Sequence, residues 1–212
     1  MNIHDCITML VECFELQTQK TMLWHEELPE IEPPKLKTIY TPSIFKELVV
    51  IQHLFNFKIW HEEDIARRRD IEPILIAECK RSIDQLNQQR NDFMEQIDIA
   101  FLNLIQPLLP TNTNNVHTNT ESLGMAIDRS SILSLKIWHM NEQVERSDVT
   151  IEHIENCKQK LHILKEQHND LNNAILNLVN EFHQGIRKPK LYFQYKMYNN
   201  PSLNPQLYSL TS

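Results

Sequence analysis

Glycine is almost missing from the chain: its 212 residues include only Gly124 and Gly185. A fold of many short strands needs tight turns, and glycine adopts their backbone conformations most readily. Leucine, isoleucine, glutamine, glutamate and lysine are all abundant, and most of them are good helix formers. The scarcity of glycine therefore argues against a turn-rich β fold and favours an all-α protein.

Three further absences narrow the functions that the sequence allows. The formal net charge is −7, so the chain lacks the excess of positive charge with which proteins neutralise the phosphates of duplex nucleic acid. No apolar run approaches the roughly 18 residues of a membrane-spanning helix, and the N-terminal residues lack the basic head and apolar core of a signal peptide. The four cysteines are spread along predicted helices rather than set in a disulfide framework. We therefore expect a cytoplasmic protein with free thiols, no membrane span and no duplex nucleic acid partner.

What the sequence does contain is an internal duplication. Residues 58–98 align with residues 136–176 without a gap, at a constant offset of 78, and 14 of the 41 aligned pairs are identical. The clearest match is the tetrapeptide Lys-Ile-Trp-His, which ends at His61 in the first copy and at His139 in the second. An ungapped duplication of this kind is typical of a structural repeat. Because polar residues match as well as apolar ones, the repeat also points to a site.

The spacing of apolar residues predicts that each copy is a helical hairpin. Residues 3–24 show a helical rhythm before the copies begin, and the prolines in residues 28–42 predict an extended linker. Asp70 and Asp148 are expected to cap the second helix of each hairpin. A polar loop at residues 110–120 joins the copies. The four predicted hairpin helices are residues 43–69, 73–106, 121–147 and 149–184.

Two hairpins with apolar stripes bury those stripes most readily against each other. We therefore predict an all-α fold, an antiparallel helical bundle built from two duplicated helical hairpins plus an N-terminal helix and an extended C-terminal arm. The prediction places one helical domain over residues 1–212, with repeat one at about 43–106 and repeat two at about 121–184. The arm covers residues 186–212, which begin basic and aromatic and become rich in asparagine and proline.

One face of the first helix in each copy changes from apolar to polar in the same order. A histidine, an acid and an arginine follow at positions i, i+3 and i+7, which are neighbours on a helix surface. The apolar stripe of the second helix is interrupted by a basic residue in each copy, and an acid lies beside it. The candidate site residues are His61, Asp64, Arg68, Arg90 and Asp92 in the first copy, and His139, Glu142, Arg146 and Asp170 in the second; the basic residue that corresponds to Arg90 is His168.

Three interpretations of these residues remain open. The preferred one is a small anionic ligand, such as a phosphate or sugar phosphate, held by the arginines with help from the histidines. The second is a metal-dependent hydrolase, because two His-x-x-acid pairs (His61 with Asp64, His139 with Glu142) resemble the ligand spacing of metal sites in helical bundles. The third is a non-catalytic interaction or scaffold protein in which the residues only fix the register of the hairpins.

A buried guanidinium without a partner costs several kcal/mol, so Arg90 needs a carboxylate from Asp64, Glu142 or Asp128. Lysines and arginines in register with the histidines would repel a metal ion, which is why the anion is preferred. The sequence identifies neither a cofactor nor a catalytic residue. It also leaves open whether a protein partner or a second copy of the chain is bound.

Several segments together resemble a bacterial family known as domain of unknown function 4254. They are Leu23-Trp24-His25, residues 59–68, residues 80–92, residues 127–140 and residues 194–205. The resemblance covers nearly the whole chain. It implies one bacterial, soluble domain of this extent, and it implies no activity.

Overall fold

The computed structural model describes residues 1–30, 39–111, 116–193, 195 and 197–208. Within these residues the chain is helical, and β structure is limited to one isolated bridge between His117 and Arg187. The prediction of an all-α fold is confirmed. Residues 31–38 of the predicted linker and residues 112–115 of the predicted loop lie outside the described residues. None of the helices in the described segments is long and apolar enough to cross a membrane.

Five long helices build the structure, and their order follows the predicted hairpins. Short helices η1 (Gln106–Leu108), η2 (Met197–Asn199) and α6 (Pro205–Tyr208) accompany them. The long helices are α1 (Ile3–Glu26), α2 (Pro42–Ala66), α3 (Pro73–Ile105), α4 (Leu123–Glu145) and α5 (Ile151–His183). Helices α3 and α5 each have 33 residues. Their first residues, and also their last, differ by 78 positions, which is the offset of the duplication.

Local sequence explains most of the helix starts. Asn2, Thr41, Ser122 and Thr150 are N-caps whose side chains accept a backbone N–H of the first turn, which satisfies donors that have no partner within the helix. The prediction that Asp70 and Asp148 cap α3 and α5 is wrong. The actual N-caps are Glu72, which makes no side-chain cap bond, and Thr150. Asp70 and Asp148 instead accept hydrogen bonds from the arginines two residues before them.

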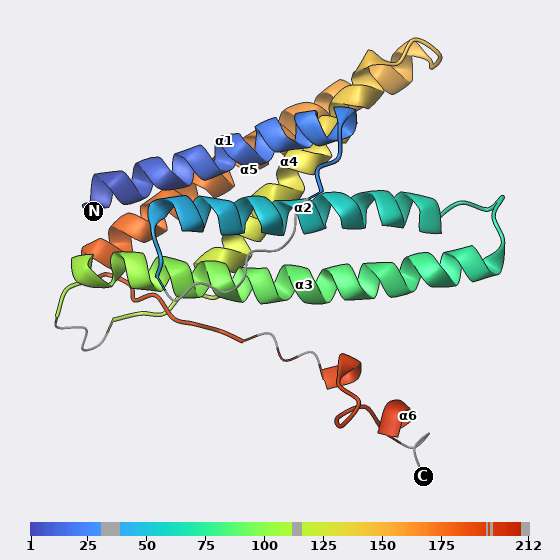
Figure 1. Ribbon diagram of the computed structural model, residues 1–212. Coiled ribbons are helices and arrows are strands. Elements are labelled where there is room, and N and C mark those ends of the chain that lie inside the picture. The colour runs from blue at the N-terminus through green and yellow to red at the C-terminus, as the bar shows by residue number, and fades with distance from the viewer. Residues whose placement is uncertain (31–38, 112–115, 194, 196, 209–212) are drawn as a thin grey trace.

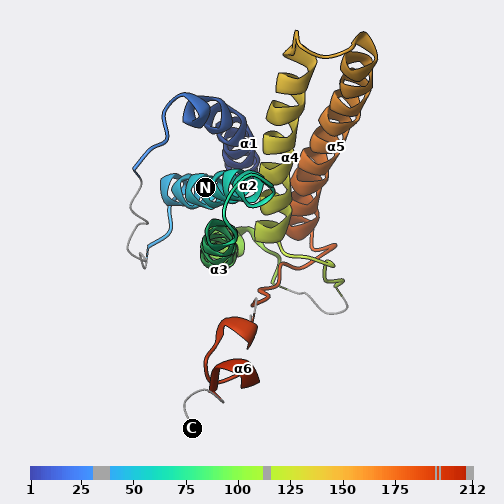
Figure 2. The ribbon, with the colours of Figure 1, turned by 90° about the vertical axis from the view of Figure 1, so that its right-hand side faces the viewer.

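The two hairpins cross obliquely, and α1 lies between them (Figures 1 and 2). Helix α2 runs antiparallel to α3, and α4 runs antiparallel to α5, while α4 also contacts both helices of the first hairpin. Helix α1 packs against α2, α4 and α5. After α5 the C-terminal arm runs below α3 in Figure 1, and Asn199 Nδ2 of the arm donates to Gln88 Oε1 of α3 at 3.5 Å.

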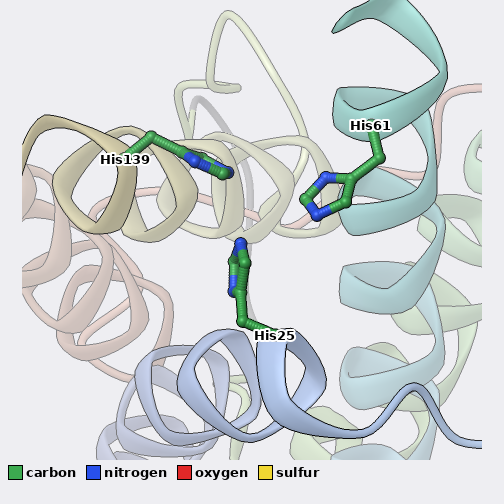
Figure 3. Close-up of side chains that lie close together, drawn as sticks. All are labelled: His25, His61 and His139. Atoms are coloured by element: carbon green, nitrogen blue, oxygen red, sulfur yellow. The ribbon is translucent and has the colours of Figure 1, made fainter. Parts of the chain in front are cut away.

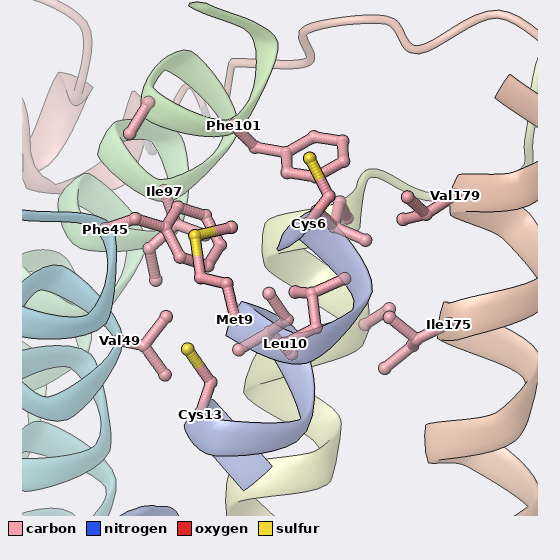
Figure 4. Packing of buried hydrophobic residues seen from close by; sticks show 14 of the residues in the cluster. Cys6, Met9, Leu10, Cys13, Phe45, Val49, Ile97, Phe101, Ile175 and Val179 are labelled. Carbon is pink, nitrogen blue, oxygen red and sulfur yellow. The ribbon is translucent and has the colours of Figure 1, made fainter. Parts of the chain in front are cut away.

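The main hydrophobic core forms around α1. Four of its side chains, Cys6, Met9, Leu10 and Cys13, are almost completely buried. Figure 4 shows them surrounded by Phe45 and Val49 of α2, Ile97 and Phe101 of α3, and Ile175 and Val179 of α5. Burying a large apolar side chain stabilises the folded state by roughly 1.5–3 kcal/mol. The burial of several such side chains therefore stabilises the packing of α1 against the hairpins.

Gly124 allows α4 to approach α3 closely. A Cβ atom at this position would collide with the backbone carbonyl oxygen of Met94 and lie 3.1 Å from the carboxylate of Asp98. The Gly124 N–H donates to Asp98 Oδ1 at 2.7 Å. Burial raises the pKa of Asp98 to about 6, against hydrogen bonds from Ser122 and Gly124 that lower it. The contact therefore depends on the missing side chain of Gly124.

Replacing Gly124 with alanine should destabilise the protein, although alanine is normally the better helix former. The added methyl group meets backbone, which cannot rotate away, so α3 and α4 must separate. Overpacking of this kind costs about 1–3 kcal/mol, to be measured as the free energy of unfolding in urea. Lys136→Ala, at an exposed position of the same helix, is the control and should change stability by less than about 0.5 kcal/mol. Gly124→Ala with unchanged or increased stability would contradict the close approach of the helices.

Candidate metal centre

Three histidines from three helices point toward one another (Figure 3). His25 lies in the last turn of α1, His61 near the end of α2 and His139 near the end of α4. Their ring centroids are 5.1 Å apart for His25 and His61, 5.0 Å for His25 and His139, and 5.6 Å for His61 and His139. Each ring offers one nitrogen, and these three nitrogens all lie within 4.8 Å of one another.

The hydrogen bonds of two rings determine which nitrogen remains for a ligand. His25 Nδ1 lies 2.6 Å from the carbonyl oxygen of Thr21, and His139 Nδ1 lies 2.7 Å from Glu142 Oε2. A carbonyl or carboxylate oxygen can only accept, so Nδ1 carries the proton in both rings and Nε2 presents a lone pair. His25 Nε2, His139 Nε2 and His61 Nδ1 are buried and make no hydrogen bond with any described residue.

The surroundings of His61 and His139 favour their neutral forms. Burial lowers the pKa of His61, and the neighbouring His25 and His139 lower it further. Burial also lowers the pKa of His139, although Glu142 raises it. Three buried ring nitrogens that face one another without a hydrogen-bond partner among the described residues are unsatisfied, which is unfavourable in a buried position. A bound cation would resolve this arrangement.

Two tryptophans hold the rings from the sides. Trp60 stacks on His139 with ring centroids 4.6 Å apart and an angle of 4° between the planes. Trp138 stacks on His25 at 5.0 Å and 25°. The indole Nε1 of Trp138 is buried and has no hydrogen-bond partner in the described part of the chain. The tryptophans that precede His61 and His139 in the sequence therefore restrict the motion of the His139 and His25 rings.

The donor set fits a transition metal. Zinc in proteins is typically tetrahedral, with imidazole nitrogens at ~2.0–2.1 Å and therefore roughly 3.3 Å from one another. The three nitrogens, which now lie within 4.8 Å of one another, would have to move closer together to bind one ion. The bonds from His25 to a backbone carbonyl and from His139 to a carboxylate are the outer contacts that metal-ligating histidines usually make. His25 also lies in the last turn of α1, where the helix dipole favours positive charge.

The duplication does not predict His25 as a site residue, because His25 lies outside the two copies. A signal was nevertheless present: each of the three tryptophans of the chain is followed directly by a histidine, at positions 24–25, 60–61 and 138–139. Those three histidines are the ones that converge.

The acids predicted to lie near the histidines differ in their roles. Glu142 bonds to His139, whereas the side chain of Asp64 makes no hydrogen bond or ion pair with the described residues. Asp64 nevertheless acts electrostatically on both His61 and His139. The acids Asp92 and Asp170 are exposed on α3 and α5, and Asp92 accepts a hydrogen bond from Gln88.

The arginines of the predicted ladder do not join the histidines. Arg68 donates to Asp70 at 3.0 and 2.7 Å, and Arg146 donates to Asp148 at 3.0 and 2.8 Å. All four residues are exposed. The physical reason is that α2 ends at Ala66 and α4 at Glu145, so helical periodicity no longer sets the direction of the arginine side chains.

A second cluster of polar side chains lies between the hairpins, apart from the three facing histidine nitrogens. Arg90 Nε lies 3.7 Å from Asp128 Oδ1, and Arg90 Nη1 donates to Asn56 Oδ1 at 3.3 Å. Asp128, one of the three carboxylates proposed from sequence, also accepts from Asn56 at 2.9 Å and from Gln52. In the second hairpin, His168 Nε2 lies 3.2 Å from Ser130 Oγ.

A directed chain of hydrogen bonds connects this group to α1. Thr21 Oγ1 donates to the carbonyl oxygen of Gln17 at 2.9 Å, so it accepts from His53 Nε2 at 3.0 Å. His53 Nδ1 then accepts from Ser131 Oγ at 2.7 Å, and Ser131 Oγ accepts from Asn56 Nδ2 at 2.9 Å. The chain fixes the tautomer of His53 and orders Thr21, whose carbonyl oxygen orients His25.

Fold and site together describe an all-α protein of duplicated hairpins with three facing histidines. The sequence model of the family described as protein of unknown function (DUF4254) matches residues 46–191, so the chain belongs to that family. The matched part includes His61 and His139, and His25 precedes it. No curated protein and no solved structure matches the chain significantly.

His53 should make the protein sensitive to acid. Burial lowers its pKa to about 3 in the folded state, against a contact with the Gln17 backbone that raises it. In the unfolded chain the pKa is about 6.5, so below this pH the unfolded state binds a proton that the folded state does not, and stability falls as pH falls. Between pH 7 and pH 5 this one group should remove about 2 kcal/mol from the free energy of unfolding.

Urea unfolding at both pH values measures the effect. His53→Gln should be less stable than wild type at pH 7, because it disturbs the hydrogen-bond chain, but it should lose about 2 kcal/mol less between pH 7 and pH 5. His4→Gln, at an exposed position of α1, should keep the pH dependence of the wild type. If His53→Gln keeps it too, His53 is not the neutral buried group described.

Proposed function

We propose that the protein binds one transition-metal ion, with zinc as the first choice, through His25, His61 and His139. The observation that carries the proposal is the convergence of three buried, unpartnered imidazole nitrogens within 4.8 Å. Nitrogen ligands favour zinc, copper, iron or nickel over magnesium and calcium, which prefer oxygen. The stacking of Trp60 on His139 and of Trp138 on His25 supports the same assignment, as does the burial of the nitrogens.

Three histidines leave the fourth position of a tetrahedral ion for water or a substrate. Structural zinc sites usually have four protein ligands, whereas sites with three protein ligands are typical of catalysis. A zinc ion in such a site lowers the pKa of its bound water to about 7. We therefore propose a metal-dependent hydrolase or hydratase, with Asp64 as the nearby carboxylate that is free to accept a proton.

Anion binding by arginines is the second candidate, and the structure gives it less support. Arg68 and Arg146 are bonded to Asp70 and Asp148 at exposed positions, and Arg90 is bonded to the polar group between the hairpins. An anion would have to displace these partners. A purely structural role suits His53, whose two ring nitrogens both have hydrogen-bond partners. It does not explain three unpartnered nitrogens facing one another.

Metal binding should be measurable directly. Chelator-treated protein should take up one equivalent of zinc in calorimetry, and zinc at about 100 times its dissociation constant should add roughly 2.7 kcal/mol to the free energy of unfolding. His25→Ala and His61→Ala should abolish both effects. Glu142→Ala removes an exposed orienting group rather than a ligand, and should weaken binding roughly 10- to 100-fold without loss of folding.

His162→Ala is the matched control, because this exposed histidine of α5 lies outside the cluster; it should bind zinc like the wild type. Circular dichroism verifies that each variant is folded. Folded wild type that takes up no zinc, copper, nickel or iron contradicts the proposal. So does uptake that persists unchanged in both histidine variants.

A further inference from the structure

A groove lies beside the metal centre, between α2, α4 and α5. It has a volume of about 640 Å³, and its lining includes His139 and Glu142. Sites for small molecules usually have volumes of about 300–1,000 Å³. The groove is therefore large enough for an organic molecule, and the proposed metal ligand His139 forms part of its wall.

The acidic groups in the groove interact with the histidines, whereas the basic groups have no ion-pair partner among the described residues. Glu142 is bonded to His139, and Asp64 acts electrostatically on His61 and His139, so both carboxylates belong to the histidine end. Lys136 and Lys160 also line the groove, are exposed, and form no ion pair with any described residue. The positive charges are thus the ones left for a ligand.

The rest of the lining is mainly apolar. Trp60, Met140, Ile163 and Leu164 contribute to it beside Gln143 and Gln167, and Ile163 is 51% exposed. A second hollow of about 510 Å³ shares Lys136 and Gln167 with the groove, so the concave surface continues along α4 and α5. Apolar walls with a few charged groups are the usual composition of a site for a small organic ligand.

We propose that this groove binds the substrate of the metal centre, and that the substrate is a small organic anion: an apolar body with a carboxylate or a phosphate monoester. Lys136 and Lys160 bind the anionic group, and Trp60 and Ile163 contact the apolar body. The proposal rests on the proposed function, because the groove is assigned to the metal centre through His139, the proposed ligand that lines it. A metal ion beside Asp64 and Glu142 offsets their negative charge, which would otherwise repel an anion.

The test uses protein loaded with cobalt(II), whose visible spectrum changes when its ligands change. Benzoate and phenyl phosphate are the two anionic probes, and they distinguish a carboxylate from a phosphate substrate. At least one of them should change the spectrum with saturation, and neutral benzamide should not. Each of Lys136→Met and Lys160→Met should weaken binding of the effective probe about tenfold, since a hydrogen bond to a charged group contributes that much or more.

Lys165→Met is the matched control, because Lys165 is exposed on α5 and does not line the groove; it should bind the probe like the wild type. All lysine variants should bind cobalt with wild-type affinity. Cobalt that binds while neither anion changes the spectrum, or an equal response in both groove variants, overturns the substrate proposal and leaves the metal proposal standing. Wild type that binds no cobalt overturns the metal centre itself, so the two failures are distinguishable.

Discussion

The docking of α1 between the two hairpins is the interaction on which the other features depend. Its apolar face is the centre of the main core, where Leu10 and Cys13 are completely buried. Near its C-terminal end the contacts become polar: Gln17 Nε2 donates to the carbonyl oxygen of Ile127, and Thr21 accepts from His53. These contacts fix the rotation of α1 about its axis. Because His25 follows one turn after Thr21, the same contacts direct it toward His61 and His139.

The duplication explains why chemically similar groups meet. Positions related by the offset of 78 face each other across the hairpins: His53 bonds to Ser131, and the rings of His61 and His139 lie 5.6 Å apart. The two repeats do not form two equivalent sites, and this difference suits a single metal ion. Two of the proposed ligands come from the repeats and the third from α1, while only one of the equivalent acids, Glu142, bonds to a histidine. An ion bound there would connect α1 to both hairpins, so metal affinity and the docking of α1 should be coupled.

The helices and their pairing could be predicted from the sequence because apolar spacing, prolines and the duplication all specify local or repeated structure. The positions of His61 and His139 on one inner face followed from the same periodicity. His25 could not be inferred in this way, because only tertiary packing brings α1 to the hairpins. The directions of the Arg68 and Arg146 side chains could not be predicted either, because α2 and α4 end before these residues. Which acid bonds to a histidine depends on side-chain geometry that two matching His-x-x-acid sequences do not distinguish.

The central claim is that three imidazole nitrogens coordinate one metal ion. X-ray absorption spectroscopy of the zinc-loaded protein at the zinc edge tests this most directly. We expect a first shell of three imidazole nitrogens and one further light atom at ~2.0–2.1 Å, with the ring scattering that imidazole produces. The His25→Ala protein should show one imidazole fewer or bind no zinc. A first shell that contains sulfur at ~2.3 Å, or only carboxylate oxygens, would contradict the three-histidine centre.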